Sequence, residues 1–94
     1  MTFKLVFKKD AKKEWDSLDP NIRSVFAKKL KERIEHPRIK SARLIGMKDC
    51  YKIKLRQVGY RLVYQVRDND LIVSVITVGK RDKNQVYKAA IKRI

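Results

Sequence analysis

The strongest constraint on the fold is a stretch of strict alternation between residues 50 and 66, C-Y-K-I-K-L-R-Q-V-G-Y-R-L-V-Y-Q-V. In each half, apolar or aromatic residues alternate with mostly polar or charged ones, a period of two that is typical of half-buried strands. The two halves meet at Val58-Gly59, which predicts a β-hairpin. Only pairings whose residue numbers add to an odd total place both apolar sets on one face, because a slip of one residue would turn Arg61 inward.

A two-residue turn satisfies this rule and pairs Arg61 with Arg56 and Lys54 with Val63. The prediction is a cluster of cations on one open face of the sheet, formed by Lys52, Lys54, Arg56 and Arg61. Like charges that face each other across strands destabilise a sheet, so this cluster suggests a role outside folding. Binding of a polyanion would provide that role. The alternative is a solvated strand face that happens to be basic.

The overall charge favours an anionic partner. The 94 residues include 25 Lys and Arg against 10 Asp and Glu, a formal net charge of +15. Nucleic acid is the first candidate, because Lys and Arg bind phosphates with release of counterions. A membrane surface would require one basic helix with a wide apolar face, whereas the basic residues here are spread over several elements. An acidic protein partner is compatible with either.

Length and cysteine usage set the class of protein. We expect residues 1–94 to form a single domain, with no linker and no repeat. The one cysteine, Cys50, excludes an internal disulfide and is typical of a reducing cytosol. The start of the chain lacks the apolar core of a signal peptide, and no apolar run approaches the ~20 residues of a membrane span. These features predict a soluble, intracellular protein.

Two helices are expected before the hairpin. The apolar spacing of Ala11, Trp15 and Leu18 predicts a helix from Asp10. Asp19-Pro20 is a strong signal for the start of a second helix, which should end at His36 because Pro37 disfavours a helical residue before it. Together they predict a helical hairpin that covers one face of a sheet.

The remaining segments complete an α+β domain. Residues 2–7 alternate as a strand, residues 38–48 read as a basic loop with Leu44 and Ile45 dipping toward the core, and residues 67–70 form a turn. The nearly continuous apolar run 71–78 predicts a central strand that ends at Gly79, and residues 84–94 predict a last helix. The expected order is β-α-α-β-β-β-α, with a mainly antiparallel sheet.

Most of the common sets of catalytic residues are missing from the sequence. His36 beside a proline is interpreted as a residue of a helix terminus, and Cys50 as a small packed residue. No cluster of His, Cys and carboxylates predicts a metal site, and no glycine-rich phosphate loop is present, so we expect no cofactor. Lys, Arg and Tyr chemistry remains: neighbouring lysines lower one another's pKa, and arginines stabilise a pentacoordinate phosphate. An RNA substrate supplies its own nucleophile, the 2′-hydroxyl.

Four motifs resemble the RelE family of bacterial toxin–antitoxin systems. They are G-M-K-D-C-Y-K-I-K-L-R-Q-V-G-Y-R-L-V-Y-Q-V, the later V-I-T-V-G-K-R-D-K-N-Q-V-Y, K-E-W in the first helix and H-P-R-I after the second. The resemblance covers essentially the whole chain. It implies the small fold shared by RelE and ParE toxins, which is similar to that of microbial ribonucleases. It also implies metal-independent cleavage of mRNA in the ribosomal A site, and inhibition of translation in the cytoplasm of a bacterium or archaeon.

The resemblance also implies partners. These are a RelB-type antitoxin, the ribosome with its 16S rRNA, and A-site mRNA; operator DNA would be bound only through the toxin–antitoxin complex, and no membrane is involved. A rival hypothesis is a ParE-like inhibitor or RNA-binding module that uses the same basic face without cutting RNA.

The family's active-site positions match this chain residue by residue: Lys52, Lys54, Arg61, Arg81 and Tyr87. In the assignment that we favour, Lys52 helps to deprotonate the 2′-hydroxyl, Lys54 protonates the leaving 5′ oxygen, and Arg61 stabilises the phosphorane charge. Arg81 and Tyr87 would hold the scissile phosphate and a neighbouring base, although either could instead transfer a proton. Further RNA contacts are expected from Lys40, Arg43, Lys48, Arg56, Lys80 and Lys83.

Overall fold

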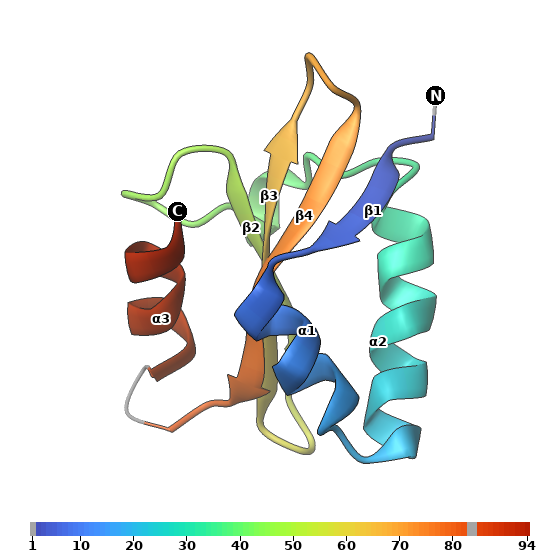
Figure 1. Ribbon diagram of the computed structural model, residues 1–94, viewed down its shortest axis with the longest axis vertical. Helices are drawn as coiled ribbons and strands as arrows, with labels where there is room; N and C mark the ends of the chain where they lie inside the picture. Colours follow the sequence, from blue (N-terminus) through green and yellow to red (C-terminus); the bar gives the residue numbers. More distant parts are fainter. Residues whose placement is uncertain (1, 83–84) are drawn as a thin grey trace.

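The computed structural model describes residues 2–82 and 85–94 and contains one four-stranded mixed sheet with three α-helices (Figure 1). The elements in chain order are β1 (Lys4–Phe7), α1 (Lys9–Asp16), α2 (Pro20–Arg33), a 3₁₀ turn (Lys40–Ala42), β2 (Cys50–Leu55), β3 (Tyr60–Arg67), β4 (Ile72–Lys80) and α3 (Gln85–Arg93). The sheet order is β1-β4-β3-β2; β1 runs parallel to β4 and the other pairs are antiparallel. The predicted α+β order and the central position of the 71–78 strand are confirmed.

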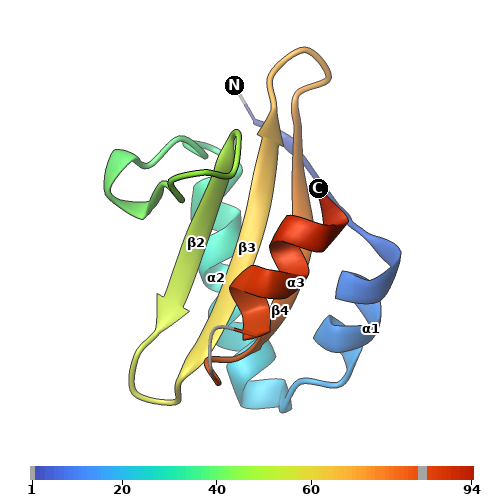
Figure 2. The same ribbon diagram turned by 90° about the vertical axis from the view of Figure 1, so that its left-hand side faces the viewer.

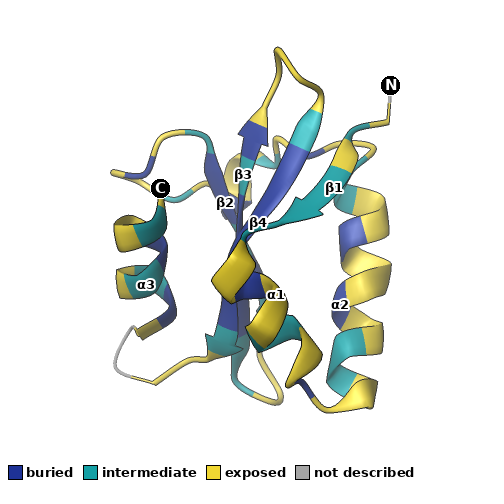
Figure 3. Cartoon of the chain, in the orientation of Figure 1, coloured by how far each residue is buried: buried dark blue, intermediate teal, exposed yellow. Residues whose placement is uncertain are grey.

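The sheet separates two cores. Figure 1 shows α1 and α2 on one side of the sheet and α3 on the other, and Figure 2 shows α3 lying across β3 and β4. The larger core holds Phe26 and Leu30 of α2 against β2, β3 and β4, with Trp15 of α1 packed between Phe7 and Phe26. The smaller core, beneath α3, contains Met47, Cys50, Val63, Ile76, Val86 and Ala90. Strands β3 and β4 are therefore buried on both faces along most of their length (Figure 3).

The central hairpin has the predicted parity but a longer loop. Lys54 pairs with Arg61 and Leu55 with Tyr60, so the connection is the four-residue loop 56–59 and the predicted two-residue turn is wrong. Two-residue hairpin turns need a positive φ at their first position, which a β-branched residue such as Val58 resists, whereas here the positive φ of 69° falls on Gly59. The pairing of Arg61 with Arg56 is replaced by pairing of Arg61 with Lys54.

Several element ends differ from the predictions. Helix α1 begins at Lys9, with Asp10 in its first turn. Helix α2 starts as predicted, because Asp19 accepts a hydrogen bond of 2.8 Å from the Asn21 amide, but it ends at Arg33 and continues to His36 only as a turn. Strand β4 runs through Gly79 to Lys80, because both residues still pair with β3. The predicted first residue of the last helix, Asn84, lies outside the described residues.

The loop before β2 packs differently from the prediction. Leu44 packs against the smaller core as expected, but Ile45 is 97% exposed, and the buried residues are instead Ala42 and Met47. Arg38 anchors the start of this loop by hydrogen bonds to Asp49, Asp68 and the Tyr51 hydroxyl. Within the described residues, no helix has the length and apolarity required to cross a membrane.

Candidate active site

A cavity of about 460 Å³ opens between the hairpin and the C-terminal helix. Its lining comes from the loop before β2, from β2, β3 and α3, and from the end of β4: Leu44, Ile45, Met47, Lys52, Lys54, Arg61, Arg81 and Tyr87. All five residues predicted as catalytic are in this set. Chain positions 35 residues apart are thus brought around one space.

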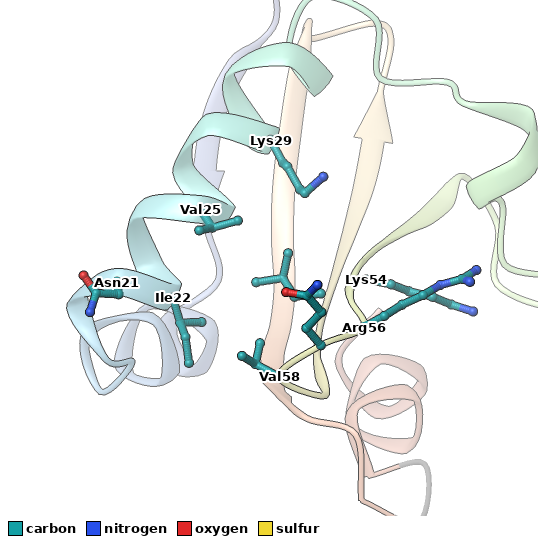
Figure 4. Close-up of a pocket in the computed structure, with 9 residues that line it drawn as sticks. Asn21, Ile22, Val25, Lys29, Lys54, Arg56 and Val58 are labelled. Carbon is teal, nitrogen blue, oxygen red and sulfur yellow. The ribbon is translucent and has the colours of Figure 1, made fainter.

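Strand β2 supplies two lysines on the face that α3 covers. Lys52 and Lys54 alternate with the buried Ile53 and Leu55, so the same pattern that fills the larger core turns both amines toward the other face. Figure 4 shows Lys54 and Arg56 reaching away from a groove between α2 and the end of β2. Both lysines are half-buried, so the predicted open basic face is wrong: α3 and the loop before β2 enclose it in part.

Arg61 is the most enclosed charge of the site. Its side chain faces Lys54 across the hairpin, and the residue is only 5% exposed. Its Nη1 donates a hydrogen bond of 2.9 Å to the carbonyl oxygen of Tyr60. No carboxylate among residues 2–82 and 85–94 forms an ion pair with Arg61. A buried cation without an acidic partner is costly, which favours an anion as the missing counter-charge.

Arg81 and Tyr87 approach the same space from the other side. The Arg81 amide donates a hydrogen bond of 2.6 Å to the Gly59 carbonyl oxygen, which ties the segment after β4 to the hairpin loop. Tyr87 is half-buried on α3 and packs against the smaller core. The first turn of α3 therefore places Tyr87 in the lining of the cavity that Lys52 and Lys54 also line.

The clustered charges alter the acidity of one lysine. The Lys54 pKa is lowered from its ordinary value, first by the charge of Lys52, then by desolvation, and then by Arg56 and Arg61. A lysine with a lowered pKa gives up its proton more readily and suits proton transfer. The site thus combines a candidate general acid with two arginines that stay charged.

Comparison with known proteins gives consistent matches over the whole chain. The family model described as ParE toxin of type II toxin–antitoxin system, parDE, matches residues 5–85. The chain is 53% identical over 94 residues to the mRNA interferase toxin RelE of Escherichia coli K12 and to the mRNA interferase RelE of Shigella flexneri, covering 100% of this chain and 99% of each relative. It belongs to the RelE/ParE family of toxins.

Solved structures of E. coli RelE agree with this assignment. An arginine-to-alanine double variant in the free state matches with a TM-score of 0.93 and 52% identity, covering 100% of this chain and 99% of that one. The isolated toxin in a second structure matches with a TM-score of 0.84 and 52% identity, at 97% coverage of both chains. The RelE fold predicted from the sequence is therefore confirmed.

The residues predicted to make further RNA contacts lie outside the cavity. Arg56 and Lys80 are exposed at the hairpin loop and the end of β4, and Lys40, Arg43 and Lys48 are exposed in the loop before β2. Lys83 lies outside the described residues. The structure thus leaves these five residues exposed at the surface, and none of them lines the cavity.

An apolar wall of the cavity was missed in the sequence. Leu44, Ile45 and Met47 line the cavity together with the cations, with Ile45 almost fully exposed beside Gly46, whose φ is 85°. The apolar residues inside an otherwise basic loop were the available signal, but Leu44 and Ile45 were interpreted as core, and for Ile45 that interpretation is wrong. Such a wall suits the flat face of an unpaired base.

Cys50 and His36 do not line the cavity. Cys50 is fully buried, so the prediction of a small packed residue is confirmed. Desolvation together with the Asp49 charge raises its pKa to about 11. His36 is exposed beyond the end of α2 and does not line the cavity. Across residues 2–82 and 85–94, no group of His, Cys, Asp and Glu could hold a metal ion.

Proposed function

We propose that this protein is a type II toxin that cleaves mRNA in the ribosomal A site by attack of a 2′-hydroxyl on the adjacent phosphate. Endonucleolytic cleavage of mRNA is supported by full-length identity of 53% to two curated mRNA interferases. The observation that carries the proposal is the convergence of five cationic or phenolic residues on one cavity around the buried, unpaired Arg61.

The proposed chemistry follows from the positions of these groups. Lys52 helps to remove the 2′-hydroxyl proton, and Lys54, with its lowered pKa, donates a proton to the leaving 5′ oxygen. Arg61 neutralises the charge that develops on the phosphorane, because a preformed cation in a sheltered site needs no reorganisation during the reaction. Arg81 and Tyr87 hold the phosphate and a neighbouring base.

Ribosome dependence is part of the proposal. The cavity lining contains no imidazole and no carboxylate, the groups that most often act as base and acid. Orientation must then supply much of the rate, and alignment of reacting groups can contribute ~7–11 kcal/mol. Binding of the mRNA in the A site would provide this alignment, and the exposed basic residues around the cavity would contact 16S rRNA.

A RelB-type antitoxin is the proposed inhibitor. Structures of relatives at 52% identity are described as the intact E. coli RelBE toxin–antitoxin complex and as a RelE variant bound to an antitoxin peptide. The net charge of +15 and the unpaired Arg61 favour an acidic segment as the neutralising element. Operator DNA would be bound only by the resulting complex.

The decisive experiment is a cleavage assay with mRNA-programmed ribosomes. The unmodified protein should cut the message in the A site, Lys54→Ala and Arg61→Ala should lose most of this activity, and Lys28→Ala on the exposed side of α2 should retain it. Intact mRNA on ribosomes that are nevertheless inhibited would favour the non-catalytic ParE-like module. Equal cutting of naked RNA at the same sites would contradict ribosome dependence.

A further inference from the structure

The C-terminal end of α3 is fastened to α1 and to the edge of β4 by one carboxylate. Arg93 donates from Nη1 to Glu14 Oε1 at 2.7 Å and from Nη2 to Glu14 Oε2 at 3.2 Å. The same Nη1 donates to the Ile76 carbonyl oxygen at 3.0 Å. Both side chains are partly buried, and the charge-assisted contact to Glu14 raises the Arg93 pKa.

Glu14 binds the edge of β4 just beyond the point where β1 ends. Strand β1 pairs with β4 as far as Phe7 and Val75, and the Lys8 amide then bonds to the Val75 carbonyl oxygen at 2.9 Å. Beyond this point Glu14 binds the same edge of β4: its Oε1 accepts hydrogen bonds from the Val78 amide at 3.3 Å and from the Thr77 hydroxyl at 3.2 Å. The contacts of Glu14 with β4 and with Arg93 are called the clamp below. Hydrogen bonds to β4 therefore fix the position of the Glu14 carboxylate to which Arg93 binds.

The clamp matters because the rest of α3 is weakly attached. The helix has nine residues, shorter than helices that are stable alone, and its buried residues are only Val86 and Ala90. Lys8 Nζ also donates to the Arg93 carbonyl oxygen at 3.0 Å, again at the last residue of the helix. Few apolar contacts and a polar tie at one end are features of an element that opens locally.

We infer that Glu14 and Arg93 are positioning residues of the active site, because they keep α3 closed on the sheet with Tyr87 in the cavity. Arg93 lies six residues after Tyr87, about 9 Å along the helix axis. It therefore attaches the C-terminal end of α3, which the hairpin does not reach. Neither residue lines the cavity. The inference rests on the proposed mRNA cleavage for its catalytic half, and on the structure alone for the closure of α3.

Hydrogen exchange of the free protein tests the closure. Arg93→Gln and Glu14→Gln should each speed amide exchange in α3 at least ~10-fold and leave β3 and β4 protected, because opening is local. Arg93→Lys should restore part of the protection, since one donor to Glu14 is kept. The control is Lys12→Ala, which removes an exposed ion pair with Asp16 on the same helix α1. Unchanged exchange in α3 would overturn the clamp.

Single-turnover cleavage on ribosomes tests the catalytic half. Arg93→Gln should slow cutting roughly 10- to 100-fold, the scale expected when a reacting group is displaced by about 1 Å. In a Tyr87→Ala background the same substitution should cost about 3-fold or less, because the residue that it positions is already gone. An equal loss in both backgrounds would overturn the role through Tyr87. If the unmodified protein cuts no mRNA, the proposed function falls, and the exchange experiment still decides whether the clamp holds α3.

Discussion

Lys54 of β2 and Arg61 of β3 face each other directly in the antiparallel ladder, on the face that α3 covers. Directly opposed residues have Cβ atoms about 5 Å apart, so two positive charges are held together where solvent is partly excluded. The sheet carries this repulsion, and among the described residues no carboxylate forms an ion pair with Lys54 or Arg61. An incoming phosphate would relieve it.

Removal of one of these charges should make the free protein more stable and less active. Lys54→Met keeps the length of the side chain but ends the repulsion with Arg61, so the melting temperature should rise slightly while cleavage falls by ~10²–10⁴-fold. Lys4→Met on the exposed side of β1 is the matched strand control and should change neither quantity much. A lower melting temperature for Lys54→Met would show that the facing charges do not destabilise the sheet.

The acidity of Lys54 should depend on Arg56, which lies outside the cavity. Because the folded-state pKa of Lys54 lies below the ordinary value of 10.5, the folded protein binds fewer protons than the unfolded chain between these two values. The repulsion therefore opposes folding below the lowered pKa, and stability increases as the pH rises through that interval. As a general acid, Lys54 should also lose activity as the pH rises through its lowered pKa.

Replacement of Arg56 by Gln tests this directly. It should raise the Lys54 pKa and move the high-pH loss of cleavage in the same direction, because one of the charges that lower it is removed. The measurement is an NMR titration of the Lys54 side chain, with Lys40→Gln as the control, because Lys40 does not line the cavity and is not among the charges that lower the Lys54 pKa. A titration that does not move in Arg56→Gln would contradict this origin of the shift.

The sequence predicted the parts of the site that local patterns control. Alternation alone placed Lys52, Lys54 and Arg61 on one face, since strand geometry leaves only two choices for each side chain. The loop length escaped prediction: parity permits several odd sums, and the choice between them depends on which residue adopts a positive φ, here Gly59. The opposed pair Lys54 and Arg61 thus became visible only in the structure.

The remaining features of the site depend on tertiary packing, which local sequence patterns do not report. Arg81 and Tyr87 were assigned to the active site through family resemblance, because no local pattern joins them to Arg61, which lies 20 and 26 residues before them. The burial of Arg61 depends on α3 and the loop before β2, which the alternation of β3 does not report. Likewise, the contact of Glu14 with Arg93 joins residues 79 positions apart.

A buried tyrosine should contribute to stability without taking part in the chemistry. The Tyr64 hydroxyl donates to the Pro37 carbonyl oxygen at 2.7 Å and accepts from Arg33 Nη1 at 2.9 Å, beneath the larger core. Tyr64→Phe removes both hydrogen bonds, although Arg33 Nη1 keeps its hydrogen bond of 3.1 Å to the Lys52 carbonyl oxygen. The substitution should lower the free energy of unfolding by about 1–3 kcal/mol, measured by urea titration. Tyr60→Phe on the same strand is the control, since no hydrogen bond joins its hydroxyl to another described residue. Equal losses for both would contradict the role of the Tyr64 hydroxyl.

The exposed Ile45 should act on cleavage and hardly on folding. Its side chain is 97% exposed at the rim of the cavity, so Ile45→Asp should change the free energy of unfolding by no more than about 0.5 kcal/mol. The new carboxylate would repel an incoming phosphate and remove an apolar surface for a base, so cleavage should fall about 10-fold or more. Ile91→Asp on the exposed side of α3 is the matched control. Full activity of Ile45→Asp would exclude this wall from RNA binding.

The roles of Lys54 and Arg61 can be separated by the leaving group. If Lys54 protonates the 5′ oxygen, a substrate with sulfur at that position needs little protonation and should restore most of the activity of Lys54→Ala. The same substrate should restore little to Arg61→Ala, because charge still develops on the phosphorane and the buried cation that neutralises it is absent. Single-turnover rates with saturating programmed ribosomes measure both effects without interference from binding.

The binding role of Lys54 gives a different pattern. A lysine that only contacts a phosphate should, when replaced, mainly weaken binding to the ribosome and lower the salt dependence by about one unit of slope. Sulfur at the leaving position would then rescue neither variant. Equal rescue of both variants would also exclude Lys54 as the acid, and Arg81, which reaches the same cavity from the end of β4, would be the next residue to test in the same way.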